Sequence, residues 1–167
     1  IDKVANYRSY DADGNAVQGK FARWFEEIYN EYIAKSAFKG LNPFPVSDVH
    51  NGYFSQDKKG KLKDTSGETK ADDDTYSLIM KDKEKLLNLE NPLQFIFSHS
   101  ALREGWDNPN VFQICTLNET KSDIKKRQEI GRGLRLAVDQ NGKRTYDQNI
   151  NRLTVIANES YDDFAKT

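Results

Sequence analysis

One short segment carries side chains suited to phosphate chemistry. Residues 128–135 read QEIGRGLR and place a glutamine and two arginines at steps of four and three residues. On a helix these steps put Gln128, Arg132 and Arg135 on one face. An arginine guanidinium presents a planar, permanently charged fork of donors, which suits the oxygens of a transferring phosphoryl group. The same spacing is also typical of a basic amphipathic helix, here over 122–134, that shows its charges to water.

Polar side chains also follow a predicted strand upstream. Two apolar runs without polar alternation, at 93–97 and 111–117, predict parallel strands covered on both faces. Directly after the first run stand Ser98, His99 and Ser100. The carboxyl ends of strands form the edge where open α/β sheets bind ligands. The three side chains are therefore candidates for contacts with a ligand.

The two segments together resemble a known family. SHSALREGWDNPNVFQICTLNE at 98–119, followed by KKRQEIGRGLRL at 125–136, resembles motifs V and VI of the second RecA-like domain in superfamily two helicases. More narrowly, the pair is similar to the restriction (Res) subunit of type III restriction enzymes. GYFSQDKKG at 52–60 and MKDKEKLL at 80–87 also fit that family, so the resemblance covers nearly the whole chain.

The resemblance implies a fold and its division into motifs. The fold is α/β, a single RecA-like domain over 1–167 with a mainly parallel sheet flanked by helices on both faces. It is like that of P-loop NTPases but lacks its own P-loop. Motif V lies at 98–109 and motif VI at 128–135. Strands that alternate with helices favour the same architecture independently.

The resemblance also assigns roles around a nucleotide. Arg132 and Arg135 occupy the two arginine positions of motif VI, and Gln128 takes its leading polar position. They would act as arginine fingers toward ATP and Mg²⁺ held by a first RecA-like domain. Gly105 and Asp107 match the Gly-x-Asp element of motif V, which contacts a ribose or braces the arginines. Asp107 could equally be only a turn residue before Asn108-Pro109-Asn110, and the residues alone favour that role, whereas the resemblance favours the functional one.

Two further roles are left open between alternatives. Gly131 and Gly133 either let the backbone approach the nucleotide or only end the helix. His50, in HNGYFS at 50–55, contacts DNA together with Ser98, His99 and Ser100 if the resemblance holds. A lone histidine is otherwise more often a satisfied structural residue.

The function implied is the ATP-dependent translocase or helicase motor of a type III restriction endonuclease, a hydrolase acting on double-stranded DNA. Its partners would be the first RecA-like domain and a nuclease domain of the same polypeptide, and a modification (methyltransferase) subunit. One alternative is the motor of a nuclease-free DNA helicase. Another is a catalytically inert RecA-like interaction module, in which the motif VI side chains are only solvated.

The chain lacks two motifs that the complete activity requires. It contains no Gly-x-x-x-x-Gly-Lys-Ser/Thr phosphate loop. It also contains no convincing Asp followed by Glu-x-Lys nuclease constellation. The isolated chain is therefore expected to be inactive, and its start without methionine suggests a fragment of a larger protein.

Composition limits the partners and the compartment. At 167 residues the chain fits one domain with a sizeable core, and its formal net charge is −1. DNA contacts must therefore come from local basic patches. The single cysteine, Cys115, fits a reducing compartment and is expected to be a small buried hydrophobe. No apolar run approaches a membrane span and no signal peptide begins the chain, so we expect a cytoplasmic protein.

The remaining pattern predicts the elements that position these residues. Aromatic and aliphatic residues recur at helical steps over 21–33 and indicate a helix whose apolar stripe is core. Short strands are expected within 46–54 and at 153–157, and the opening residues 1–4 look like the tail of a strand. Turns are expected at 11–15 and 139–143.

A polar stretch at about 56–74 reads as a flexible insertion. It ends at three aspartates, 72–74, ahead of a helix predicted over 75–89. We interpret these carboxylates as a helix cap that complements the dipole, because no further ligand stands at metal-binding spacing. No metal site is expected.

Overall fold

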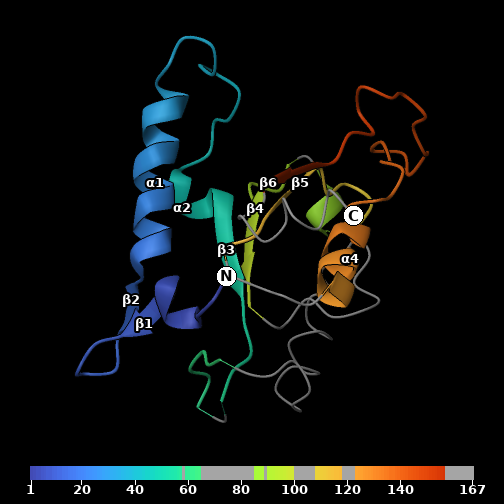
Figure 1. The fold of residues 1–167 in the computed structure, drawn as a ribbon. Coiled ribbons are helices and arrows are strands. Elements are labelled where there is room, and N and C mark those ends of the chain that lie inside the picture. Colours follow the sequence, from blue (N-terminus) through green and yellow to red (C-terminus); the bar gives the residue numbers. More distant parts are fainter. Residues whose placement is uncertain (58, 65–84, 89, 100–107, 118–122, 157–167) are drawn as a thin grey trace. The chain divides into compact units, whose positions relative to one another are not determined.

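The computed structural model describes residues 1–57, 59–64, 85–88, 90–99, 108–117 and 123–156 (Figure 1). The chain divides into two compact units, each described by itself. The first contains the described residues from 3 to 64 and from 90 to 99, together with Ile1. The second contains those from 85 to 88 and from 108 onward, together with Asp2.

The first unit is built on one long helix and a parallel strand pair. The helix α1 spans Lys20–Ile33, and β3 (His50–Tyr53) pairs in parallel with β4 (Phe95–Ser98). Figure 1 shows α1 beside this pair, with the short α2 (Val46–Val49) leading into β3. Two short strands, β1 (Arg8–Tyr10) and β2 (Ala16–Gln18), form an antiparallel hairpin before α1. The predicted helix and strands are confirmed, whereas the hairpin was not predicted.

The core of the first unit gathers side chains from several elements. Val4, Tyr7, Ala22 and Phe54 are buried together, and partly buried apolar side chains pack against them: Ile1, Leu62 and Phe97. The opening residues form no strand, since the first element is a 3₁₀ turn at Val4–Asn6. The prediction of a strand tail there is wrong. Instead, a carboxylate holds this turn, because the Val4 N–H donates to Asp64 Oδ1 at 2.7 Å.

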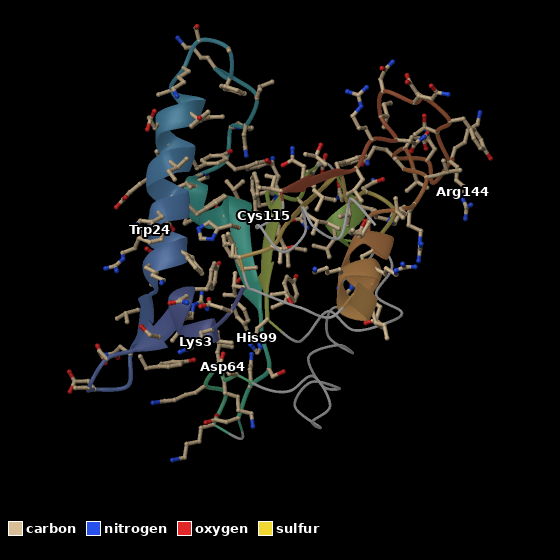
Figure 2. The ribbon with its side chains drawn as sticks, in the orientation of Figure 1. Lys3, Trp24, Asp64, His99, Cys115 and Arg144 are labelled. Carbon is tan, nitrogen blue, oxygen red and sulfur yellow. The ribbon has the colours of Figure 1, made fainter. Side chains whose placement is uncertain are left out.

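The apolar stripe on α1 is only partly core. Phe25 and Tyr29 are half-buried, and both rings contact Phe95 of β4, at centroid distances of 4.9 and 6.1 Å. Trp24, labelled in Figure 2, and Ile28 are instead exposed, with 52% and 56% of their surface accessible. The prediction that the whole stripe is core is therefore wrong. Helical spacing identified the apolar residues, but the stripe is wider than the face that β4 covers.

The second unit contains a second parallel strand pair. β5 (Gln113–Cys115) pairs with β6 (Thr154–Ile156), and α4 (Asp123–Gly131) lies between them in sequence. A 3₁₀ turn at Lys85–Leu87 completes its named elements. Both strands were predicted. Cys115 is exposed, so its expected role as a buried hydrophobe is wrong, because β5 alternates exposed and half-buried residues and its cysteine lies on the exposed side.

Three tight turns share one pattern, an aspartate three residues before a glycine. They begin at Asp11, Asp57 and Asp139. In each, the carboxylate accepts the N–H groups two and four residues later, at 2.8 to 3.0 Å. Each glycine has a positive φ, between 74° and 87°, which a residue with a Cβ rarely adopts. The hydrogen bonds favour the ionised carboxylate and lower the pKa of all three aspartates.

The turns at 11–15 and 139–143 confirm two predictions. The turn at Asp57 corrects the prediction of a flexible insertion at about 56–74, because Gln56 and Leu62 face each other in an antiparallel bridge. The start of the predicted flexible insertion is therefore ordered, and Leu62 packs on the core. The rest of it, the aspartates 72–74 and most of the helix predicted over 75–89 lie outside the described residues.

Two parallel strand pairs with helices confirm the α/β class in its coarse form. A continuous RecA-like sheet, helices on both of its faces and a single domain over 1–167 stay predictions. In the part of the chain that the structure describes, no helix is long and apolar enough to cross a membrane.

Candidate functional site

The predicted phosphate-binding segment begins on a helix and continues beyond it. α4 ends at Gly131, and the Gly133 N–H then donates to Ile130 O at 3.0 Å in a tighter turn. Gln128 is helical, Arg132 lies in the turn and Arg135 lies past it. The prediction that the three side chains share one helical face is therefore wrong. The cause is the glycine pair, which ends the helix early.

The two arginines differ in exposure. Arg132 is half-buried and Arg135 is exposed. The Arg135 guanidinium donates two long hydrogen bonds of 3.4 Å, to the backbone carbonyls of Gly131 and Leu134. Contacts this long with local carbonyls are weak. Arg135 is the more accessible of the two arginines to solvent.

Gly133 has a packing role that neither of its predicted alternatives included. It is buried, and a Cβ at this position would lie 2.4 Å from Cδ1 of Leu153. That distance is far inside van der Waals contact, so any side chain here must displace Leu153. The residue after Leu153 begins β6, and its N–H donates to Phe112 O at 2.9 Å. Because it has no side chain, Gly133 allows the backbone beside Arg132 to pack closely against Leu153, directly before β6.

The turn at the end of motif V, Asn108-Pro109-Asn110, is held by asparagine side chains. Asn108 is buried, and its Oδ1 accepts the Asn110 N–H at 2.9 Å. The Asn110 amide in turn meets the backbone of Val138, three residues past Arg135. Its Nδ2 donates to Val138 O at 3.1 Å, and its Oδ1 accepts the Val138 N–H at 3.0 Å. The turn at Asn108-Pro109-Asn110 is therefore joined to the backbone of Val138, whereas Asp107 itself lies outside the described residues.

The predicted DNA-contacting residues are divided by the structure. β4 ends at Ser98, so Ser98 and His99 do stand at the carboxyl end of a parallel strand, and both are half-buried. The Nδ1 of His99 is buried and has no hydrogen-bond partner among the described atoms. Ser100, Gly105 and Asp107 lie outside the described residues.

His50 lies at the opposite, amino end of the strand pair, in register with Phe95. Only 7% of its surface is accessible. Its Nε2 lies 3.0 Å from Glu26 Oε1, and its Nδ1 lies 2.9 Å from the Tyr7 hydroxyl. An ionised carboxylate only accepts, so Nε2 donates to Glu26, and in the neutral imidazole Nδ1 accepts from the Tyr7 hydroxyl. Both ring nitrogens are therefore used inside the protein, as in the structural alternative stated above.

The Tyr7 hydroxyl keeps its proton in this arrangement. Burial is the main cause that raises the pKa of Tyr7 to about 12. A phenol with so high a pKa is a hydrogen-bond donor at neutral pH and not an activated nucleophile. A polar pocket of about 500 Å³ beside His50 is lined by side chains of both charges, including Arg8, Glu26 and Asp48. Its mixed charge identifies no class of ligand.

No group of three or more potential metal ligands occurs among the described residues. The candidate residues fall into two groups: hydroxyl and imidazole side chains after β4 in the first unit, and basic and amide side chains after α4 and at Asn108–Asn110 in the second. Sequence reasoning missed Asn110, Gly133 and Leu153 as supports of the second group. The Asn108-Pro109-Asn110 turn signal was visible, but its long-range partner at Val138 was not.

Comparison with known proteins agrees with the resemblance drawn from motifs V and VI. The chain is 41% identical over 165 residues to the Res subunits of two type III restriction-modification enzymes, EcoP15I from Escherichia coli and EcoPI from Escherichia phage P1. Each match covers 89% of this chain and 15% of the relative. The chain is also 26% identical over 155 residues to the candidate helicase 22 of Sulfolobus islandicus filamentous virus, covering 87% of this chain and 27% of that protein. No protein-family model matches.

These findings confirm that the chain is a homologue of type III Res subunits. The chain spans only about 15% of the length of these relatives. The homology therefore concerns a segment, and the roles of individual residues rest on other arguments.

Proposed function

We propose that this chain is a motor segment of an ATP-dependent type III restriction endonuclease, and that Arg135 and Arg132 act on ATP bound by a first RecA-like domain. The observation that carries the proposal is 41% identity to Res subunits over 165 residues, a stretch that includes both arginines. The exposure of Arg135 past the end of α4 agrees with a side chain that reaches outside its own unit.

The chemistry of this site fits a nucleotide. In phosphoryl transfer, charge spreads over the γ-phosphoryl oxygens, and catalysis depends on positioning and electrostatic stabilisation. ATP with Mg²⁺ supplies the transferred group and the metal when bound. The guanidinium of Arg135 would stabilise the developing charge, with Arg132 and Gln128 beside it in sequence. Gly105, Asp107 and Gly131 remain proposed nucleotide contacts through the family resemblance.

The proposed DNA contacts belong to the edge at the end of β4. Ser98, His99 and Ser100 offer hydroxyl and imidazole groups to the phosphate backbone of double-stranded DNA. The buried Nδ1 of His99 leaves a polar atom at that edge for which the described residues provide no partner. His50 would contribute to this surface only indirectly, because both of its ring nitrogens are bound to Tyr7 and Glu26.

The complete enzyme would contain further parts. We propose a nuclease domain in the same polypeptide and a modification (methyltransferase) subunit as partner, as the family resemblance implies. A second candidate is the motor of a nuclease-free DNA helicase, which the similarity to a candidate viral helicase favours. The sequence of the complete polypeptide separates the two, because only the first requires a carboxylate and lysine nuclease site.

The test is DNA-stimulated ATP hydrolysis by the complete enzyme that carries this segment. Arg135→Ala should lower kcat by about 10³ to 10⁵, roughly 4 to 7 kcal/mol of barrier, because the transition state loses its cation. ATP binding, measured in parallel, should be largely retained. Arg144→Ala is the matched control, since Arg144 is an exposed arginine near the turn at 139–143 (Figure 2).

The control should hydrolyse ATP at the wild-type rate. A near-normal rate for the Arg135→Ala enzyme would contradict the motor role of this arginine. It would favour the alternative of a catalytically inert interaction module, in which the basic residues after α4 are only solvated.

A further inference from the structure

The segment that carries Arg135 is fixed on both sides while the arginine itself is exposed. On the amino-terminal side, Gly133 is buried against Leu153 and bonded to Ile130 O. On the carboxyl-terminal side, Ala137 is only 3% exposed. Between these fixed points only three residues remain, so the path of the backbone at Arg135 is set by how firmly the two ends are held.

Two asparagine side chains hold the carboxyl-terminal end. The Asn151 Oδ1 accepts the Ala137 N–H at 2.9 Å, and its Nδ2 donates to Thr145 O at 2.8 Å. The Asn110 amide holds the next residue, Val138, at both its N–H and its carbonyl. The two amides add to an antiparallel backbone pairing, in which Val138 faces Arg144 and the Thr145 N–H donates to Ala137 O at 2.8 Å.

Asn110 differs from Asn151 in where it comes from. It directly follows motif V, and its own backbone N–H is fixed by the buried Asn108. A displacement of the turn at Asn108–Asn110 would therefore move Val138 as well, because the Asn110 amide binds its N–H and its carbonyl. Val138 lies three residues from Arg135. The asparagine amide both donates and accepts at these positions, whereas an ionised aspartate of the same length lacks the donor.

We propose that Asn110 is a positioning residue for Arg135. Its side chain joins the turn at Asn108–Asn110 to Val138, at the end of the segment 133–138 that carries Arg135. The inference rests on the proposed function, since it assumes that Arg135 acts in ATP hydrolysis. Asn110 itself contacts no substrate in this role. Its effect comes through the placement of the guanidinium, and a misplacement of about 1 Å can cost about 10²-fold in rate.

The experiment uses the complete enzyme and measures kcat and KM for ATP in the presence of DNA. Asn110→Ala should lower kcat by about 10- to 100-fold and leave KM nearly unchanged, because nucleotide binding does not involve Asn110. Asn110→Asp keeps the acceptor for the Val138 N–H and should lose less. Asn149→Ala is the matched control, because Asn149 is exposed and its backbone N–H bond to Asp147 survives the change.

The double variant Asn110→Ala, Arg135→Ala separates positioning from general structural damage. If Asn110 acts through Arg135, the double variant should have the same kcat as Arg135→Ala alone, within about twofold. The inference would be overturned if the loss of kcat in the double variant equalled the product of the two single losses. A wild-type kcat for Asn110→Ala would overturn it as well. If Asn110→Ala does not fold, the same comparison is made with Asn110→Asp, and thermal unfolding of each variant identifies that case.

The two proposals fail in different ways. A normal rate for Arg135→Ala contradicts the proposed function itself. A severe loss for Arg135→Ala with a normal rate for both Asn110 variants leaves the proposed function standing and removes only the positioning role of Asn110.

Discussion

The imidazole of His50 shows how a residue type that suggests chemistry can instead hold a fold together. Its two nitrogens join Glu26 of α1 to Tyr7, and its ring packs against Phe25 at a centroid distance of 4.7 Å. The chain from Tyr7 through His50 to Glu26 crosses from the core to the surface. Each member satisfies a polar group that burial would otherwise leave without a partner.

Removal of the Tyr7 hydroxyl tests this role. Tyr7→Phe deletes the donor to the His50 Nδ1 and leaves a buried acceptor unsatisfied, which should lower the free energy of unfolding by about 1–3 kcal/mol. Urea denaturation of the wild-type and variant chains measures the difference. Tyr146→Phe is the control, because Tyr146 is 77% exposed and loses no buried hydrogen bond. Equal losses for the two variants would contradict the assignment.

Among the elements, α1 has one covered face and one open face, and this division gives a second prediction. Phe25→Ala removes ring contacts with His50, Phe95 and Phe97, and should destabilise the chain by about 2–3 kcal/mol, below the range for fully buried phenylalanine. Trp24→Ala removes a larger but exposed ring and should cost about 0.5 kcal/mol or less. Chemical denaturation measures the free energy of unfolding of both variants. A larger loss for Trp24→Ala than for Phe25→Ala would mean that the exposed face of α1 is covered in solution.

The elements that the sequence predicts well are those with a local cause. The helix over 21–33 follows from apolar periodicity, and β4, β5 and β6 follow from short apolar runs. The turn at 139–143 follows from an aspartate and a glycine at fixed spacing. In each case a few neighbouring residues are sufficient to favour the structure.

What the sequence did not reveal depends on partners distant along the chain. Which half of the α1 stripe is buried depends on β4, more than sixty residues later. The need for glycine at 133 depends on Leu153, and the role of Asn110 depends on Val138. The glycines at 131 and 133 indicate an early end of α4, which ends at Gly131, whereas the spacing of Gln128, Arg132 and Arg135 favours a longer helix. Local pattern therefore predicted the candidate residues of the site but not the contacts that support them.

For the whole molecule, the balance of charge limits how the chain meets DNA. Its formal net charge of −1 gives no general attraction to a polyanion. Under the proposed function, DNA contact would therefore depend on local groups such as those at the end of β4. The same holds for the nucleotide. The arginines proposed to act on ATP are present in this chain, whereas the phosphate loop that would hold ATP is not.

This separation of the arginines from the phosphate loop predicts that the isolated chain has no ATPase activity, with or without DNA. An arginine finger stabilises charge on a nucleotide that another element must hold, and without that element there is no bound substrate to act on. Phosphate release measured with Mg²⁺, ATP and linear DNA should therefore stay at the level of a protein-free sample, whereas the complete enzyme turns over under the same conditions. Turnover by the isolated chain that Arg135→Ala abolishes would mean that ATP binds within these 167 residues, and the proposed separation would then be wrong.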